Sequence, residues 1–174
     1  MNIDIIKTGY LKENCYVLSI KNECLIIDPG DDFDKIEKVV GNKKVLKVLR
    51  THYHFDHVGV LSDIIKKYNC DVIDYKSNQN NIINDFEFKI INTKGHKEDC
   101  ITFYFEKDNV MFTGDFIFKD SIGRTDLKGG SKIEMKKSID KIKKYPKKTI
   151  LYPGHGDRTT LEYEINNNVF LKGI

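Results

Sequence analysis

The sequence predicts a protein of the α/β or α+β class, built from packed layers of sheet and helix. Segments rich in branched and aromatic residues alternate with segments whose apolar residues recur at helical spacing. The length of 174 residues is enough for one domain with a substantial core and too short for two. No repeat, low-complexity tract or linker interrupts the chain, so we expect one domain over residues 1–174.

Three strands are expected at the start of the chain. Branched and aromatic residues are concentrated at Ile3–Ile6, Tyr16–Ile20 and Cys24–Ile27, with short polar breaks between them. This pattern predicts an antiparallel meander. The segment Asp28-Pro29-Gly30 then ends the meander in a turn.

Helices and a further strand follow the meander. Residues Phe33–Gly41 have the apolar spacing of a surface helix, behind the capping candidates Asp31 and Asp32. The alternating segment Val45–Leu49 predicts a strand. Apolar residues three, four and seven positions apart within Leu61–Tyr68 predict a second amphipathic helix.

The middle of the chain is expected to contain strands and one irregular segment. A short strand is predicted at Asp71–Asp74, and a loop with at most a turn of helix at residues 75–85, where it could overhang a site. Strands are then predicted at Phe86–Ile91, Ile101–Phe105 and Val110–Thr113.

The last third predicts two helices and one strand. Ser131 and Glu134 form a capping box at the start of an amphipathic helix that Pro146 terminates. Residues Thr149–Tyr152 predict a final strand, and the tail from Thr159 to Phe170 predicts one short helix.

Metal-binding groups are concentrated in the segment Thr51-His52-Tyr53-His54-Phe55-Asp56-His57. Ordinary packing or solvation gives no reason for three imidazoles and a carboxylate within six positions, so the segment predicts a metal site. Residues two apart face opposite sides of a helix but the same side of an extended chain, so His52 and His54 require a loop that leaves the preceding strand. Asp56 and His57 then lie where the chain turns and can face the same cavity, which suggests two ions.

The other two of the five histidines follow predicted strands beside glycines. They are His96 in Thr93-Lys94-Gly95-His96 and His155 in Pro153-Gly154-His155-Gly156, and Asp115 in Gly114-Asp115 has the same context. Loops that leave the same edge of packed sheets can converge in space. We therefore expect these three side chains to join the histidine-rich segment.

Imidazole and carboxylate ligands favour zinc, with iron or manganese as alternatives, because no thiolate pair is present. We assign His52, His54 and His96 to one ion, and Asp56, His57 and His155 to the other. Asp115 is expected to bridge the two ions. Two divalent ions about 3.5 to 4 Å apart can share a water, lower its pKa toward about 7 and so produce a hydroxide nucleophile. Asp56 is also a candidate to orient this hydroxide or accept its proton.

Composition excludes several classes of function. The formal net charge is +3 with the charges interspersed, so neither nucleic acid nor membrane is indicated as a partner, and a small-molecule substrate is expected. Four single cysteines argue against a thiolate zinc site or a redox pair. Residues 1–20 lack the apolar core of a signal peptide, and no run reaches membrane-spanning length, so we expect a soluble, cytoplasmic protein.

These residues resemble the metallo-β-lactamase superfamily, whose His-x-His-x-Asp-His signature corresponds to His52–His57. The later candidate ligands His96, Asp115 and His155 follow in family order. Within the superfamily, the chain is most similar to the small glyoxalase II-like hydrolases, over nearly its whole length. The supporting segments are Asn14-Cys15-Tyr16, Ile27-Asp28-Pro29-Gly30, Ser121–Leu127, Thr159-Thr160 and Glu164.

The resemblance implies an αββα four-layer sandwich of the α+β class, with two mixed sheets between helices and the ions at one edge. It also implies a hydrolase of a thioester of the S-2-hydroxyacylglutathione kind. Arg124 is a candidate to bind a substrate carboxylate, with an ion pair to Asp126 as the alternative. Cys100, where the family has a small residue or serine, is expected near the site, which it would sensitise to oxidation. The chain ends at Ile174 without the helical domain that binds glutathione in full-length glyoxalase II enzymes, so the thiol specificity stays open.

Three other functions are alternatives. A persulfide dioxygenase, which uses one iron, has a similar Gly-Arg-Thr-Asp loop, but the segment Pro153-Gly154-His155-Gly156 argues against it. Phosphodiesterases and nucleases of the superfamily use the same ligand set, but they usually carry RNA-binding arms or further domains. A non-catalytic metal-binding module is the last alternative, and no degraded ligand position favours it.

Overall fold

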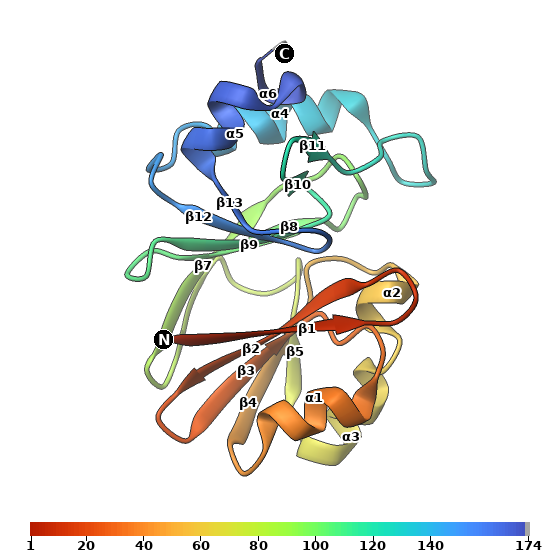
Figure 1. Cartoon of the computed structure of the whole chain (residues 1–174), viewed down its shortest axis with the longest axis vertical. Coiled ribbons are helices and arrows are strands. Elements are labelled where there is room, and N and C mark those ends of the chain that lie inside the picture. Colours follow the sequence, from red (N-terminus) through yellow and green to blue (C-terminus); the bar gives the residue numbers. More distant parts are fainter. Residues whose placement is uncertain (173–174) are drawn as a thin grey trace.

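Two mixed β-sheets lie face to face, and helices cover the outer face of each sheet (Figure 1). The structure is a computed structural model that describes residues 1–172. One buried apolar cluster lies between the sheets, and a further cluster lies beneath the helices on each side. This arrangement confirms the expected αββα sandwich with its two mixed sheets.

The first part of the chain forms a five-stranded sheet and the helices that cover it. Its elements are β1 (Asn2–Thr8), β2 (Glu13–Ile20), β3 (Glu23–Ile27), α1 (Phe33–Val40), β4 (Lys44–Leu49), α2 (Phe55–Val58), α3 (Leu61–Tyr68) and β5 (Asp71–Ile73). The strand order is β1-β2-β3-β4-β5. The first three strands are antiparallel, as the predicted meander requires, whereas β3, β4 and β5 run parallel.

The second part forms a six-stranded sheet and three covering helices. Its elements are β6 (Asn80–Ile83), β7 (Phe86–Asn92), β8 (Ile101–Phe105), β9 (Val110–Gly114), β10 (Ile117–Phe118), β11 (Ser121–Ile122), α4 (Lys132–Ile142), β12 (Ile150–Pro153), β13 (Thr159–Thr160), α5 (Leu161–Asn167) and α6 (Val169–Lys172). The order is β13-β12-β9-β8-β7-β6, in which only β9 and β12 pair in parallel, and β10 with β11 forms a separate small hairpin. Within residues 1–172, no helix combines the length and the apolar character that crossing a membrane would need.

Aromatic residues join the two sheets close to the edge where the candidate ligands lie. The Tyr16 ring packs edge-on against Phe112 and Tyr152, at centroid distances of 5.0 and 5.7 Å. The Tyr16 hydroxyl donates a hydrogen bond of 2.5 Å to the carbonyl of Pro153, and the backbone N–H of Asn14 donates to the carbonyl of Gly154 at 2.7 Å. These contacts hold β2 of the first sheet against the segment that carries His155.

The segment 75–85 differs from the predicted loop. Residues Asn80–Ile83 form the edge strand β6, which pairs antiparallel with β7. Asn84 makes the connecting turn with a positive φ of 50°. The strand was missed because asparagines are poor strand formers and because Ile82 is 77% exposed, so that no clear alternation marks a buried face. No residue of the segment 75–85 lines the groove beside the candidate ligands, so the segment does not overhang them.

The structure confirms half of the predicted cap of α4 and corrects the predicted start of α1. The Ser131 hydroxyl accepts the backbone N–H of Glu134 at 3.2 Å and so caps α4, but the Ser131 N–H donates to the carbonyl of Gly95, so the second half of the capping box does not form. Asp32 instead has a left-handed backbone with φ 53°, and its side chain makes no capping bond to α1. Its carboxylate accepts the N–H of Gly9 at 3.1 Å and the ammonium of Lys35 at 2.7 Å. Asp32 therefore ties the β1–β2 hairpin to the start of α1.

The tail forms a short strand and two short helices, which corrects the prediction of one helix over Thr159–Phe170. Asn168 interrupts the helical path because its backbone is extended, with ψ 116°. Its side-chain amide donates to the carbonyl of Ser121 at 2.9 Å and to the buried carboxylate of Glu164 at 2.8 Å. The bond to Ser121 is a tertiary contact that could not be read from local spacing, whereas the bond to Glu164 is local, four residues back.

Candidate metal centre

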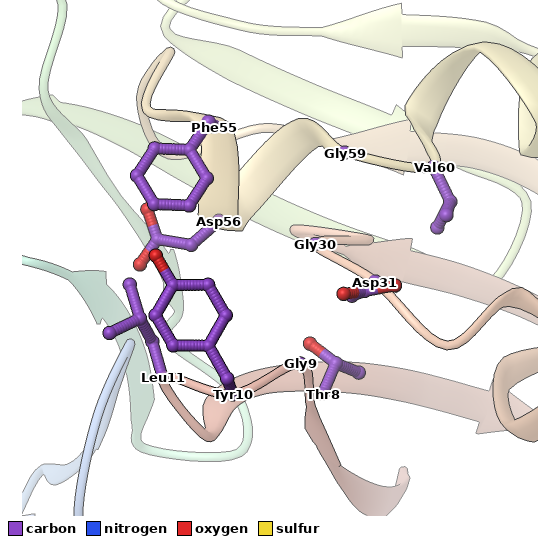
Figure 2. A pocket seen from close by; sticks show the side chains of 10 residues that line it. All are labelled: Thr8, Gly9, Tyr10, Leu11, Gly30, Asp31, Phe55, Asp56, Gly59 and Val60. Carbon is purple, nitrogen blue, oxygen red and sulfur yellow. The ribbon is translucent and has the colours of Figure 1, made fainter.

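The candidate ligands converge at one edge of the sandwich, where strands from both sheets end. The loop after β4 contributes His52 and His54, and the short helix α2 contributes His57 and Asp56, which lies beside the Phe55 ring (Figure 2). From the second sheet, the loops after β7, β9 and β12 contribute His96, Asp115 and His155. The structure therefore brings together all seven residues that the sequence singled out.

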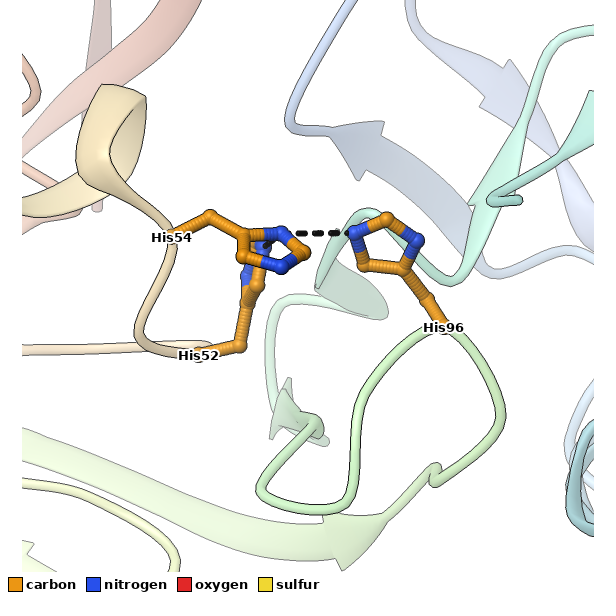
Figure 3. A group of neighbouring side chains, drawn as sticks. All are labelled: His52, His54 and His96. Carbon is orange, nitrogen blue, oxygen red and sulfur yellow. Dashed lines mark hydrogen bonds between the residues drawn. The ribbon is translucent and has the colours of Figure 1, made fainter. Parts of the chain in front are cut away.

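His52, His54 and His96 form a first group, in which three rings from two loops turn toward one another (Figure 3). The Nδ1 atom of His54 lies 3.0 Å from Nε2 of His52 and 2.9 Å from Nε2 of His96. His54 has an extended backbone, as the two-residue spacing from His52 predicts. These three nitrogens could hold one cation.

Asp56, His57 and His155 form a second group, and Asp115 lies between the groups. Nε2 of His155 is 3.2 Å from Oδ2 of Asp56. One Asp115 oxygen, Oδ1, lies 3.2 Å from Nε2 of His57. The other, Oδ2, lies 3.6 Å from Nε2 of His96 in the first group. The two oxygens of Asp115 thus face different groups, which is the arrangement expected of a bridging carboxylate.

Hydrogen bonds behind the first group determine which ring nitrogens carry the proton. Nδ1 of His96 lies 2.7 Å from the carbonyl oxygen of Arg124, which can only accept, so Nδ1 carries the proton. Nδ1 of His52 lies 3.1 Å from Oγ1 of Thr51, and this hydroxyl donates its own proton to Asp28 at 2.5 Å. In both rings the lone pair is therefore on Nε2, which points into the centre.

The second group has the same arrangement. Nδ1 of His57 donates to Oδ2 of Asp28 at 2.9 Å, and Nδ1 of His155 donates to the carbonyl oxygen of Leu11 at 3.3 Å. An outward N–H bonded to an oxygen and an inward lone pair are typical of histidines that bind metal, because the outer bond orients the ring.

Two buried atoms that face each other beside the second group have no hydrogen-bond partner. They are Nε2 of His57 and Oδ1 of the bridging candidate Asp115. Both are lone-pair atoms, and they face each other across 3.2 Å. Only a cation or an added proton between them removes this repulsion. A Cβ at Gly154 would come within 2.4 Å of the same Asp115 oxygen, so glycine is needed to leave this space open. The donor set therefore fits divalent cations.

The electrostatics of the centre also favour a cation. Burial, reinforced by neighbouring histidines, lowers the pKa of His52 and His54, so both rings are neutral at neutral pH and could serve as ligands. Burial opposes charge on His57, but Asp115 and Asp28 outweigh it and raise the pKa of this ring. The pKa of Asp115 is lowered because the attraction of His57 exceeds the opposing effect of burial. The protein thus favours positive charge between anionic carboxylates.

Asp28 is the most important residue whose role the sequence did not reveal. The sequence places Asp28 in the turn that ends the meander and in a segment that supports the family resemblance, without a role. Its carboxylate accepts the backbone N–H of Thr51 at 2.7 Å, the Thr51 hydroxyl and the His57 ring. Glu13 is a second buried carboxyl behind His57, with Oε1 3.7 Å from Nδ1. A charged residue directly after an apolar strand was the available signal for Asp28.

A groove of about 600 Å³ leads to the centre, and Arg124 lies on its wall. The guanidinium of Arg124 makes two hydrogen bonds to Asp126, at 3.0 and 2.8 Å, and both side chains are largely exposed. The predicted ion pair is therefore present, while binding of a substrate carboxylate by Arg124 stays a prediction. Apolar groove residues are Tyr10, Leu11, Phe55, Phe118, Ile122 and Leu127.

Cys100 does not have the properties expected of an oxidation-sensitive residue. Its side chain is buried, and burial with the nearby charge of Asp99 raises the pKa of the thiol. Because the thiolate is the reactive form, the structure argues against the predicted sensitivity.

Known proteins share both the sequence pattern and this fold. The family model for the metallo-beta-lactamase superfamily matches residues 8–81 and 78–155. A hydroxyacylglutathione hydrolase of Pelagibacter ubique (strain HTCC1062) is 34% identical over 188 residues, which cover 98% of this chain and 74% of the relative. Crystal structures of BLEG-1 B3 metallo-beta-lactamase and of TTHA1623 in a di-iron-bound form superpose with TM-scores of 0.95 and 0.87. The first is 29% identical in sequence, and the match covers 99% of this chain and 100% of that chain. The second is 26% identical, and the match covers 96% of this chain and 99% of that chain.

The burial of the cysteines predicts that the native protein resists thiol reagents. All four thiols are buried, and burial raises the pKa of Cys24 to about 11. With 5,5′-dithiobis(2-nitrobenzoate) at pH 8, we expect almost no release of chromophore from the native protein, and reaction of all four thiols after unfolding in guanidinium. Fast reaction of one thiol that disappears in Cys100→Ser would contradict the structure and restore the oxidation hypothesis.

Proposed function

The chain belongs to the metallo-β-lactamase superfamily, and from this premise we propose that it hydrolyses a small-molecule thioester with the help of two divalent metal ions. The observation that carries the proposal is the division of seven side chains into two groups with inward-facing lone pairs, joined by Asp115. The superfamily supports a metal-dependent hydrolase in general. The thioester substrate and the number of ions are our inference.

We assign the ions to the two groups on chemical grounds. His52, His54 and His96 would hold the first ion, Asp56, His57 and His155 the second, and Asp115 both. Nitrogen and oxygen ligands favour zinc, with iron or manganese as alternatives, and the relative TTHA1623 was solved in a di-iron form. When bound, such ions lower the pKa of a coordinated water from its value in bulk toward about 7 and so supply a nucleophile at neutral pH.

The chain's own residues orient the reactants and handle the proton. Burial opposes charge on Asp56, but His155 and His57 outweigh it and lower the pKa of this carboxyl, so Asp56 is anionic at neutral pH. Its side chain lines the groove, where it is placed to orient an attacking water and accept its proton. The outward hydrogen bonds of His52, His57, His96 and His155 hold the rings in one orientation.

The thioester is the substrate class that the name of one relative supports. The 34% identical relative is named a hydroxyacylglutathione hydrolase. In the proposed reaction, the oxygen of water bonds to the acyl carbon and the carbon–sulfur bond breaks. The products are a carboxylic acid and a thiol, which takes up a proton. Arg124 could bind a carboxylate or hydroxyl group of the substrate if its pair with Asp126 opens.

Elemental analysis with a substrate panel tests the proposal. We expect two metal ions per chain and hydrolysis of lactoyl thioesters in preference to phosphodiesters. One iron per chain with sulfite formed from glutathione persulfide would favour a persulfide dioxygenase. Hydrolysis of phosphodiesters alone would favour the nuclease alternative, and metal binding without turnover of any ester would indicate a binding module.

Replacement of His54 tests the first ion site. His54→Ala removes the nitrogen that lies about midway between His52 and His96, so we expect loss of most bound metal and an activity loss of at least about 100-fold. The fold should persist, because His54 is only partly buried. Metal content, rate and circular dichroism measure these effects. The control is Tyr53→Ala, since Tyr53 is 57% exposed in the same loop. Unchanged metal content in His54→Ala would disprove the assignment.

Replacement of Asp28 tests the bonds behind the ligands. Asp28→Asn keeps the shape of the side chain but loses the charge that orients His57, so we expect metal affinity to fall about 10- to 100-fold. Competition with a chromophoric chelator measures the affinity. Asp34→Asn changes the same charge on the exposed side of α1 and should bind metal like the parent protein. Equal affinity of the Asp28 and Asp34 variants would show that Asp28 has no such role.

A further inference from the structure

A second cavity of about 330 Å³ opens beside the groove (Figure 2). It lies between the tip of the β1–β2 hairpin, the turn after β3 and the segment from α2 to the start of α3. Four of its lining residues also line the groove: Tyr10, Leu11, Phe55 and Asp56. A molecule bound in the groove can therefore extend one arm into this side cavity.

Two exposed aromatic rings stand at the entrance of the side cavity. Tyr10 is 80% exposed and Phe55 is 63% exposed. The rings are nearly parallel, with an interplanar angle of 19° and centroids 6.4 Å apart, and Figure 2 shows both beside Asp56 and Leu11. Aromatic residues exposed together next to a polar centre are typical of a binding site for an apolar group.

The floor of the side cavity is bare backbone. A Cβ on Gly30 would lie 1.7 Å from the carbonyl oxygen of Asp56, and a Cβ on Gly59 would lie 2.2 Å from the carbonyl oxygen of Gly30. These close approaches exclude side chains at both positions. The cavity is therefore a consequence of how the turn after β3 packs against α2, and Val60 closes its far end.

The hairpin tip that carries Tyr10 is held at both ends. The N–H of Gly9 donates to Asp32 at 3.1 Å, the N–H of Lys12 donates to the carbonyl of Gly9 at 3.2 Å, and the carbonyl of Leu11 accepts from His155 at 3.3 Å. A tip that is already ordered loses little conformational freedom when a ligand binds.

The charge of the side cavity is negative. Its ten lining residues include Asp31 and Asp56 and no Lys, Arg or His. Asp31 makes no ion pair within residues 1–172, because the nearby Lys35 pairs with Asp32 instead. Bound metal would compensate Asp56 but not Asp31. An anionic group, such as either carboxylate of glutathione, is therefore disfavoured there.

We propose that the side cavity binds the thiol half of the substrate and selects an uncharged or cationic, apolar thiol over an anionic one. This inference rests on the proposed thioester hydrolysis. A 2-hydroxyacyl group is too small to need a second cavity of this size, whereas the thiol half can extend past Tyr10 and Phe55. The ring contacts favour an aromatic thiol, and Asp31 disfavours a carboxylate.

Four lactoyl thioesters with matched thiols test the proposal on the metal-loaded protein: the S-methyl, S-benzyl, S-(4-carboxybenzyl) and S-(4-aminomethylbenzyl) esters. We expect kcat/KM for the benzyl ester to exceed that for the methyl ester about 10-fold, mainly through KM, because the arm buries apolar surface. The aminomethyl ester should exceed the carboxy ester about 3-fold, which is the effect of one exposed charge.

Variants assign these differences to the side cavity. Tyr10→Ala should bring the ratio of benzyl to methyl ester close to one, and Asp31→Asn should remove the difference between the charged esters. Tyr163→Ala is the control, because Tyr163 is a partly exposed tyrosine on α5 outside both the groove and the side cavity. If the methyl and benzyl esters are hydrolysed equally well and Tyr10→Ala has no effect on their ratio, the inference is overturned. The proposed function would remain intact.

A binding measurement on the metal-free protein is independent of turnover. Benzyl alcohol added to ¹⁵N-labelled protein should shift the backbone amide signals of Gly9, Gly30 and Gly59, and 4-carboxybenzyl alcohol should shift them less. Shifts confined to other parts of the chain would overturn the inference. Failure of all four thioesters to react, together with shifts at these glycines, would overturn the proposed function and the thiol half as occupant, while the preference of the side cavity for an uncharged apolar group would stand.

Discussion

Two lone-pair atoms that face each other across 3.2 Å, Nε2 of His57 and Oδ1 of Asp115, impose the constraint that the rest of the structure meets. Such atoms repel in a buried environment, so the surrounding chain must hold them in place. Asp28 behind His57 and the missing side chain of Gly154 beside Asp115 do so. The pair therefore makes the position favourable for a cation, or for a proton on His57.

The centre exists only where the two sheets meet. The first sheet contributes the histidine-rich segment after β4 and α2, and the second contributes three loops after β7, β9 and β12. Neither of the two groups assigned to an ion is complete within one sheet, because His96 completes the first group and His155 the second. The aromatic contacts of Tyr16 and its bond to Pro153 hold the sheets in register at this edge. Packing between the sheets therefore determines the spacing of the ligands.

The β1–β2 hairpin links the candidate metal centre to the side cavity. The carbonyl of Leu11 orients His155, while the neighbouring Tyr10 projects over the side cavity with Phe55. Asp32, which was expected to cap a helix, anchors the same hairpin through Gly9. One short turn thus supports a candidate ligand and also shapes the space in which a substrate arm would lie.

The sequence by itself determined the types and order of most elements and the identity of the candidate ligands. Both follow from local patterns: alternation, helical spacing, and five histidines that all lie in the dense motif or beside strand-end glycines. Tertiary structure decided the rest. The carbonyls of Leu11 and Arg124 that orient two of the rings have no side-chain signature, and Asp28 reads as a turn residue until Thr51 and His57 are placed against it. The strand β6 was within reach of local sequence, because it pairs with β7 through the short turn at Asn84 and Asp85, but its asparagines and the exposed Ile82 hide it. The break at Asn168 was not, because a side-chain bond across 47 residues is set by a distant partner.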